Sequence, residues 1–382
     1  MHNRIYFLNY ICKFQITNTP FTQSLNHSFT HSLIHSFIHS FIYTSETHKG
    51  RTILLWFRKT LRLHDNAPLN AAIYYASEYG TVLPVFILDK WTSNPQNIGD
   101  VRFEFLMQSL RCLDKNLKAK GMPTGLLFVQ GDPTVVLPKI WKSFGVEAMA
   151  WDDSEEMEVH DRARDQTIVT LAAKHGIHTM HDRHTHWLHS PQDYASALKG
   201  KGAPRTYTSF LALFEKTGPV AEPLPAPDSI PCQLTSDELS QMAKNFLLLD
   251  TSSNINIDIT IIPSRLRSKT QIKFQGGEDE GLRRFNHLVT QRETWIGQYD
   301  KPKTSPTSLD PSTTVLSPYL THGCLSMRTV WHGIQEVYGR LGGRHTTPPV
   351  SLAGESFYFK ITSNIYLFVH HWQVGKFLQV FY

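Results

Sequence analysis

The sequence is poor in cysteine, and this scarcity argues against two classes of protein. Only four cysteines occur in 382 residues, and none stands in a Cys-x-x-Cys pair. Structural zinc sites and disulfide frameworks both need paired or regularly spaced cysteines. Neither is indicated here, and a reducing, intracellular compartment is expected.

Long apolar runs are missing as well. No stretch approaches the roughly 20 apolar residues that a membrane-spanning helix needs, and the start lacks the basic region and unbroken apolar core of a secretion signal. We therefore expect a soluble protein with no membrane partner. The hydrophobic share of 41% still suffices for buried cores, and the length predicts two domains.

Strong net charge is also absent. The formal charge of +5 is a mild excess of Lys and Arg, which fits a nucleic-acid partner and equally fits an ordinary solvated surface. Charge alone leaves both interpretations open.

The first fifty residues contain a tetrapeptide repeat instead of a core pattern. His27, His31, His35 and His39 recur four residues apart, a spacing that could bind metal on a helix. No carboxylate or cysteine joins them, and translated simple-sequence DNA explains the repeat better. We interpret residues 1–50 as a low-complexity, disordered leader; an organelle presequence is the alternative, but such leaders are rich in arginine.

From residue 52 onward, short apolar runs alternate with amphipathic segments. This alternation predicts an α/β domain with a doubly wound, mainly parallel sheet. The predicted strands are Ile53–Phe57, Val82–Leu88, Gly125–Val129, Val146–Trp151 and Ile177–Met180. The predicted helices lie at about 66–77, 101–120, 133–144 and 158–175.

The loop after the first predicted strand lies at the sheet edge where ligands usually bind. It runs from Arg58 to Asn66, and Asp65 or Asn66 is placed to cap the next helix. No Gly-x-Gly-x-x-Gly follows the strand, which disfavours a dinucleotide dehydrogenase. An acidic run, 152–156, precedes the fourth predicted helix and could favour its positive end.

Beyond the α/β domain the pattern becomes less regular. The Pro-rich stretch Pro219–Pro231 predicts an extended connection, and an Ile alternation within 244–274 would suit an edge strand. Helical spacing returns at residue 276. The apolar face of that helix is predicted to be Leu282, Phe285, Leu288 and Trp295.

A cluster of hydroxyl side chains follows at Ser312, Thr313, Thr314 and Ser317, with Pro318 suited to a first helical turn. Hydroxyls and backbone amides converging at a helix start can hold a phosphate. The same cluster could simply cap a helix. Spacing alone favours the cap.

Two stretches carry a family resemblance and occur in the family's order. Trp56–Asn66 and Lys301–Met327 resemble motifs of the photolyase and cryptochrome family. The resemblance implies that the α/β part is an antenna domain, able to hold a deazaflavin or pterin, and that FAD binds the later helices. It assigns the flavin phosphates to Thr313, Thr314, Val315, Leu316 and Ser317, and the flavin's other flank to Lys301.

The stretch 301–317 resembles the (6-4) photolyases more than the animal clock cryptochromes, and 345–352 continues that likeness. Within this resemblance, Arg58 and Asp65 are interpreted chiefly as a pair that pins their loop to the domain interface. The acidic run near Asp152 resembles a loop beside the antenna.

The resemblance also implies domain bounds. We expect an antenna domain at 51–190, a linker with an aberrant insert at 191–275, the start of the FAD-binding domain at 276–352 and an aberrant tail at 353–382. The family continues after Leu352 into a Trp-Arg-Glu-Phe-Phe-Tyr type motif that is missing here. Our hypothesis is that insert and tail are translated intron sequence, so the flavin domain is truncated.

The intact relative would repair (6-4) photoproducts in UV-damaged DNA by electron transfer from reduced FAD, as a monomer in the nucleus. Cytoplasm or an organelle are the alternative locations. Two other functions remain open: a cryptochrome-type blue-light photoreceptor and transcriptional regulator, or an inert nucleotide-binding α/β fragment. No catalytic residue can be assigned, since the lesion-pocket histidines would lie beyond Leu352, and the chain itself is expected to lack repair activity.

Overall fold

The computed structural model describes residues 51–77, 79–94, 97–152, 159–182, 188–200, 202, 204, 206–248, 274–300, 313–347 and 351–353. The leader, most of the Ile-rich stretch and the tail therefore lie outside the described residues. The elements in chain order are β1 Thr52–Phe57, α3 Ala67–Ala76, β2 Thr81–Leu88, α4 Lys90–Ser93, α5 Asp100–Ala119, β3 Leu127–Gln130, α6 Pro133–Ser143, β4 Val146–Asp152, α7 Val159–Lys174, β5 His178–Asp182, α8 Pro191–Leu198, α9 Tyr207–Thr217, α10 Ser236–Leu248, α11 Glu278–Gln291, α12 Glu293–Gly297, α13 Ser317–Thr321 and α14 Met327–Arg340.

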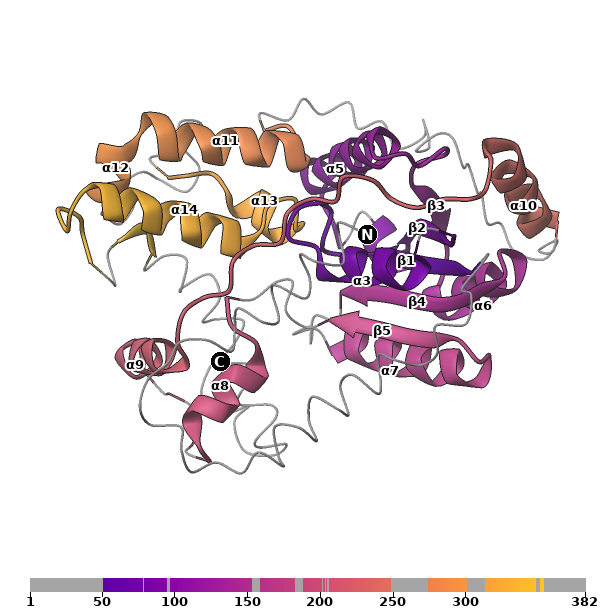
Figure 1. The fold of residues 1–382 in the computed structure, drawn as a ribbon, viewed down its shortest axis with the longest axis horizontal. Coiled ribbons are helices and arrows are strands. Elements are labelled where there is room, and N and C mark those ends of the chain that lie inside the picture. The colour runs from indigo at the N-terminus through magenta and orange to yellow at the C-terminus, as the bar shows by residue number, and fades with distance from the viewer. Residues whose placement is uncertain are drawn as a thin grey trace. The chain divides into compact units, whose positions relative to one another are not determined.

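The five strands form one parallel sheet in the order β3-β2-β1-β4-β5 (Figure 1). In its register, Trp56 on the central strand β1 lies opposite Val85 of β2 and Trp151 of β4. Each strand matches its prediction to within two residues at either end. The prediction of a doubly wound parallel sheet is confirmed.

Side chains of the central strand alternate between two apolar layers, as the period of two requires. Ile53, Leu55 and Phe57 pack with α3 and α5, whereas Leu54 and Trp56 pack with α6 and α7 on the other face. Every residue of β1 and β2 is buried. Both strands are covered on both faces, which explains their unbroken apolar sequence.

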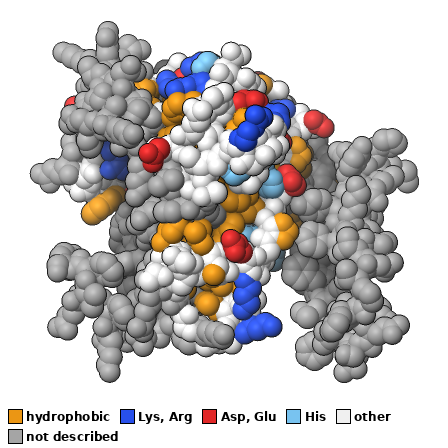
Figure 2. All heavy atoms as spheres, turned by 90° about the vertical axis from the view of Figure 1, so that its left-hand side faces the viewer, with side chains coloured by type: hydrophobic (Ala, Val, Ile, Leu, Met, Phe, Trp, Pro, Cys, Tyr) orange, Lys and Arg blue, Asp and Glu red, His pale blue; other side chains and the backbone are white. Residues whose placement is uncertain are grey.

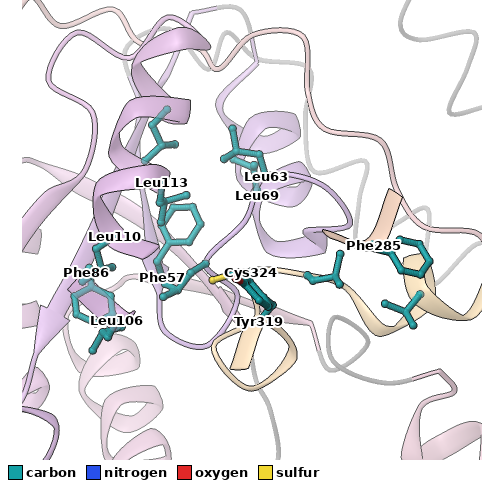
Figure 3. Close-up of a cluster of buried hydrophobic side chains, with 14 of the residues drawn as sticks. Phe57, Leu63, Leu69, Phe86, Leu106, Leu110, Leu113, Phe285, Tyr319 and Cys324 are labelled. Carbon is teal, nitrogen blue, oxygen red and sulfur yellow. The ribbon is translucent and has the colours of Figure 1, made fainter. Parts of the chain in front are cut away.

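The layer on the α3 and α5 side continues into the helices that follow residue 276 (Figure 3). Tyr319 of α13 is fully buried, and its ring meets Phe105 of α5 edge to face at 5.2 Å between centroids. Cys324 and Leu325 belong to the same cluster. The α/β part and the helices α11 to α14 therefore share one hydrophobic core.

Helix α11 supplies the predicted apolar face in part. Phe285 and Leu288 are buried, and Leu282 is partly buried beside them. Trp295 also packs against this core, but it lies on the separate helix α12, because α11 ends at Gln291 and Arg292 separates the two helices. The face predicted as one helix is thus built by two.

The segment from 191 to 248, expected as a linker, contains the helices α8, α9 and α10. Between α9 and α10 the Pro-rich stretch is extended, as predicted, and it pairs with the α/β part: the Val82 amide donates to the Pro231 carbonyl at 2.9 Å. Leu239 of α10 is buried beside α6. We call residues 218–235 the strap, because they lead from α9 to α10 across the α/β part (Figure 1).

Among the described residues, no helix combines the length and the apolar character that crossing a bilayer would require. Figure 2 shows hydrophobic side chains gathered in the middle of one face. Charged side chains of both signs are scattered around them.

Candidate functional site

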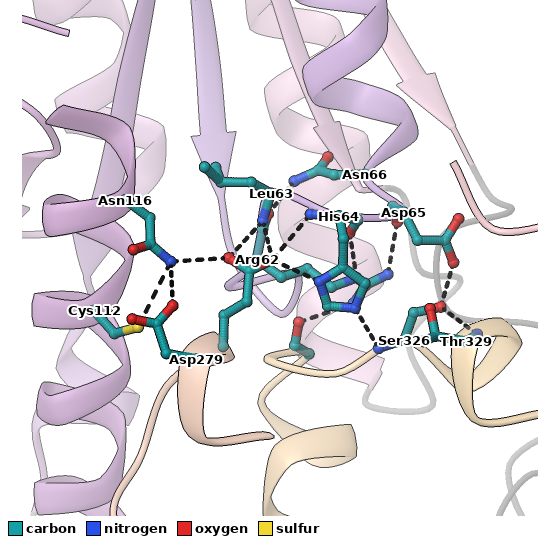
Figure 4. A network of polar contacts seen from close by, with 12 residues as sticks. Arg62, Leu63, His64, Asp65, Asn66, Cys112, Asn116, Asp279, Ser326 and Thr329 are labelled. Carbon is teal, nitrogen blue, oxygen red and sulfur yellow. Dashed lines mark hydrogen bonds and ion pairs between the residues drawn. The ribbon is translucent and has the colours of Figure 1, made fainter. Parts of the chain in front are cut away.

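The loop after β1, residues 58–66, meets the start of α11 and the turn between α13 and α14 in a buried polar network (Figure 4). We call the six residues that carry this network the domain joint. They are Arg62, His64, Asp65, Glu278, Ser326 and Arg328. The predicted flavin turn, Thr313–Ser317, ends nine residues before Ser326 in the sequence.

Arg62 occupies the centre of the joint and is 1% exposed. Its guanidinium donates to three backbone carbonyls: Nε to His64 at 3.0 Å, Nη2 to Asp65 at 2.9 Å and Nη1 to Gly323 at 2.9 Å. The first two bonds shape its own loop. The third ties that loop to the turn before α14.

Asp65 is fully buried and adopts a left-handed backbone conformation with φ of 46°, which Asp tolerates better than most residues. Its carboxylate accepts from the Ser326 hydroxyl and from Nε and Nη2 of Arg328, the Nε bond measuring 3.0 Å. Burial alone would raise the pKa of Asp65, but the bonds and charges of Arg328, with Arg62 and Ser326, outweigh burial and lower it. Asp65 therefore stays ionised.

Glu278 receives the other side of the loop. Its carboxylate accepts from the amides of Leu63 and His64, each at 3.0 Å, and lies 2.5 Å from Nδ1 of His64. Burial pushes the pKa of Glu278 upward, and the contacts with His64 and Leu63 reverse the direction, so the pKa is lowered. Nε2 of His64 accepts from the Ser326 amide at 3.2 Å, so Nδ1 is the ring nitrogen that donates to Glu278.

The predicted flavin turn is described from Thr313 onward. Thr313, Thr314 and Val315 are partly buried, Leu316 is buried and Ser317 is exposed at the first position of α13. Val315 has a φ of 56°, which is strained for a β-branched side chain. Nothing in the residue pattern indicated this strain. Lys301 and Ser312 lie outside the described residues.

The predicted pairing of Arg58 with Asp65 is wrong, although both residues pin the loop. Arg58 binds Asp165 of α7 at 2.6 Å and lies over the ring of Trp56, whereas Asp65 binds Arg328 across the joint. Arg58 extends from β1 toward the α7 side of the sheet, so the side chains of Arg58 and Asp65 bind different partners.

The side chain of Asp152 is engaged in hydrogen bonds, so it does not act solely as a negative charge near a helix end. It is buried and accepts from the Thr60 hydroxyl at 2.7 Å and the Lys59 amide at 3.2 Å. The rest of the acidic run lies outside the described residues. Asn66, one of the two predicted caps, does cap α3 by accepting from the Leu69 amide at 3.0 Å.

Sequence reasoning missed five of the six joint residues: Arg62, His64, Glu278 and Ser326 lie in segments that the sequence singled out but received no role, and Arg328 directly follows the Lys301–Met327 motif. The only available signal was their position beside the two motif loops. No group of three or more metal-ligating side chains occurs within the described part of the chain. The histidine repeat lies outside it.

Breaking the joint should destabilise the fold strongly. We expect Asp65→Asn to lower the free energy of unfolding by about 3–5 kcal/mol, because it leaves the buried Arg328 without its counter-charge. Asp279→Asn, at the solvent-exposed pair with Lys115, should cost much less. Urea unfolding measures both, and equal losses would contradict the central role of Asp65.

His322 should make stability fall on acidification. Burial, with the nearby charges of Arg102 and Lys59, lowers its pKa to about 4, whereas an unfolded histidine titrates near 6.5. The unfolded state therefore binds the extra proton first, and stability is lost between these two values. From pH 7 to 5 we expect a loss of about 2 kcal/mol from this group. Urea unfolding of His322→Phe should show a loss smaller by that amount, and an unchanged loss would refute the assignment.

Comparisons with known proteins agree with this architecture. Residues 53–228 match the family model described as DNA photolyase. The chain is 34% identical over 322 residues to Cryptochrome-2 of Gallus gallus, covering 81% of this chain and 51% of that protein. It is 31% identical over 328 residues to a (6-4)DNA photolyase of Oryza sativa subsp. japonica, covering 82% of this chain and 55% of that protein.

The chain thus spans about half the length of the curated relatives it matches. Among solved structures, the cryptochrome of Synechocystis sp. PCC6803 matches with a TM-score of 0.61 at 21% identity, covering 84% of this chain and 61% of that one. At this identity the match shows the fold alone. Residues 53–228 therefore form a domain of the DNA photolyase family, and the chain is a homologue of the cryptochromes and (6-4) photolyases.

Proposed function

We propose that this chain binds FAD through the turn Thr313–Ser317 and derives from a light-driven DNA-repair enzyme of the (6-4) photolyase type. The turn is the observation that carries the proposal. Members of the DNA photolyase family bind FAD, and this turn is where the sequence resembles their flavin-diphosphate loop.

The donor chemistry of the turn fits a diphosphate. Three hydroxyls, on Thr313, Thr314 and Ser317, lie within five residues, and no acidic side chain stands among them. Thr314 Oγ1 accepts from the Leu316 amide at 3.3 Å, so its own proton can be donated to a ligand. Val315 is left-handed there, a strain of a kind that collects at ligand sites.

The other residues of the turn hold it in place. Leu316 is buried in the shared core, so Thr314 and Ser317 on either side of it are fixed relative to α13. Lys301 is proposed to approach the flavin's other flank. Bound FAD would supply the light-driven electron transfer, and these residues would bind and orient its phosphates.

The repair role is proposed for a protein of the relatives' length, with UV-damaged DNA as partner and the lesion flipped into a pocket. A nuclear location, a monomeric state and a deazaflavin or pterin antenna in the α/β domain belong to the same proposal. They rest on the resemblance of 301–317 and 345–352 to (6-4) photolyases.

A cryptochrome-type photoreceptor is the second candidate. The identity of 34% to Cryptochrome-2 of Gallus gallus favours it, and the shared α/β domain does not distinguish the two roles. Repair requires a pocket that takes up the lesion, whereas a photoreceptor needs only flavin and a protein partner.

Placing a negative charge on the turn should weaken FAD binding. We expect Ser317→Asp to raise the Kd for FAD about tenfold or more, because a carboxylate would repel the diphosphate at short range. Ser196→Asp, at an exposed serine on α8, is the matched control and should leave the Kd unchanged. Titration followed by flavin fluorescence measures both, and equal affinities for all three proteins would contradict the assigned turn.

The chain of 382 residues alone should show no light-dependent repair. It spans about half the length of its relatives, and no residue in it is assigned to the lesion pocket. Duplex DNA with a single (6-4) photoproduct, illuminated with blue light beside the purified chain and reduced FAD, is the test. Removal of the lesion would refute this expectation, and would favour repair over the photoreceptor role.

A further inference from the structure

We infer that Asp65, a residue of the α/β domain, is a positioning residue for the flavin turn. It acts through Ser326 and Arg328 at the other end of the segment that carries the turn. This inference rests on the proposed function and adds a residue that makes no contact with FAD.

The segment from the turn to the joint is continuously hydrogen bonded. The Leu320 amide donates to the Leu316 carbonyl at 3.0 Å, and the His322 amide to the Pro318 carbonyl at 3.1 Å. The Leu325 amide donates to the Tyr319 carbonyl at 3.2 Å. A displacement at one end of this ten-residue segment, 316–325, is therefore transmitted to the other end.

Tyr319 holds the middle of the segment. Its ring is fully buried against Phe105, and its hydroxyl donates to the Gln275 carbonyl at 2.7 Å. A Cβ on Gly281 would lie 3.0 Å from the same ring, so α11 also presses on it. Helix α13 cannot rotate without breaking these contacts.

The α/β loop holds the far end. Arg62 donates to the Gly323 carbonyl at 2.9 Å and the Leu61 amide approaches the His322 carbonyl at 3.4 Å. Gly323 has a φ of 66°, and any Cβ there would overlap the Lys59 carbonyl. The backbones of the two segments, at Gly323 and Lys59, are thus in direct contact.

The Asp65 carboxylate supplies the negative charge that binds Ser326 and Arg328 at this end of the segment. Ser326 donates its hydroxyl proton to Asp65, which orients its oxygen to accept from the Arg328 amide at 3.1 Å and cap α14. Arg328 adds its guanidinium to the same carboxylate. Asn at position 65 would keep the size and the left-handed backbone, but it could not neutralise Arg328.

Linkage makes the coupling reciprocal. If Asp65 holds the segment in the form that binds FAD, bound FAD must favour the closed joint by the same factor. Two independent readouts follow: the affinity for FAD, and the amide exchange of residues 58–66 and 313–328.

The test compares the full chain with three variants by flavin fluorescence titration and hydrogen exchange. Asp65→Asn should weaken FAD binding about tenfold, and Ser326→Ala, a milder change, should weaken it by a smaller factor. Asp165→Asn is the control: it breaks the part-buried pair with Arg58 of the same loop, which does not reach the turn. Its affinity should stay within about twofold of the parent chain.

Hydrogen exchange separates positioning from general loss of stability. Without FAD, Asp65→Asn should speed exchange at 313–328 and leave β2 and β4 protected. With FAD, exchange at 58–66 should slow in the parent chain. Should Asp65→Asn fail to fold, Ser326→Ala decides the question by the same two readouts.

Equal affinity of Asp65→Asn and the parent chain would overturn the inference and leave the proposed function standing. Equal weakening by Asp65→Asn and Asp165→Asn would also overturn it, because the effect would then be generic. If the parent chain binds no FAD, the proposed function fails and this inference with it.

Discussion

The buried ion pair between Asp65 and Arg328 is the interaction on which the arrangement of this protein depends. Two charges cannot be removed from water unless each is paired and hydrogen bonded. Here Arg62 and Arg328 face Asp65 and Glu278, so the joint holds two positive and two negative groups. His64 adds hydrogen bonds to both Glu278 and Ser326. The joint is therefore electrically balanced only when all three segments meet.

This balance makes the two parts of the chain interdependent. Asp65 and Arg328 are 263 residues apart in sequence. Bringing them together therefore costs chain entropy. Without α14, the α/β domain would keep Asp65 buried beside Arg62 with most of its hydrogen bonds lost. Without the β1 loop, Ser326 would lose the partner of its hydroxyl. Neither part satisfies its own polar groups, which favours a single cooperative unit over two independent domains.

The sequence predicted what depends on neighbours along the chain. Periodicity located all five strands, and side-chain chemistry located the Asn66 cap and the extended strap. Sequence-based prediction failed where the interacting residues are distant in the sequence. Asp65 was placed correctly at the interface but paired with the wrong arginine. The break at Arg292, which moves Trp295 to another helix, was missed because apolar spacing continues across it. For the flavin turn, the sequence supplied the hydroxyls but not the left-handed Val315.

The strap completes the joint, and this determines how the helices can move. Asp65 donates its amide to the Leu224 carbonyl at 2.7 Å and accepts from the Leu224 amide at 3.0 Å, so one residue binds the strap and α14 together. His332 lies one turn after Arg328 on α14 and contacts the strap at the Ala221 carbonyl, 3.0 Å away, and at Glu222. One face of α14 thus holds both the β1 loop and the strap. Any shift of α14 would have to break both sets of contacts at once, so the strap, which joins the helices to the α/β domain, also docks them against it.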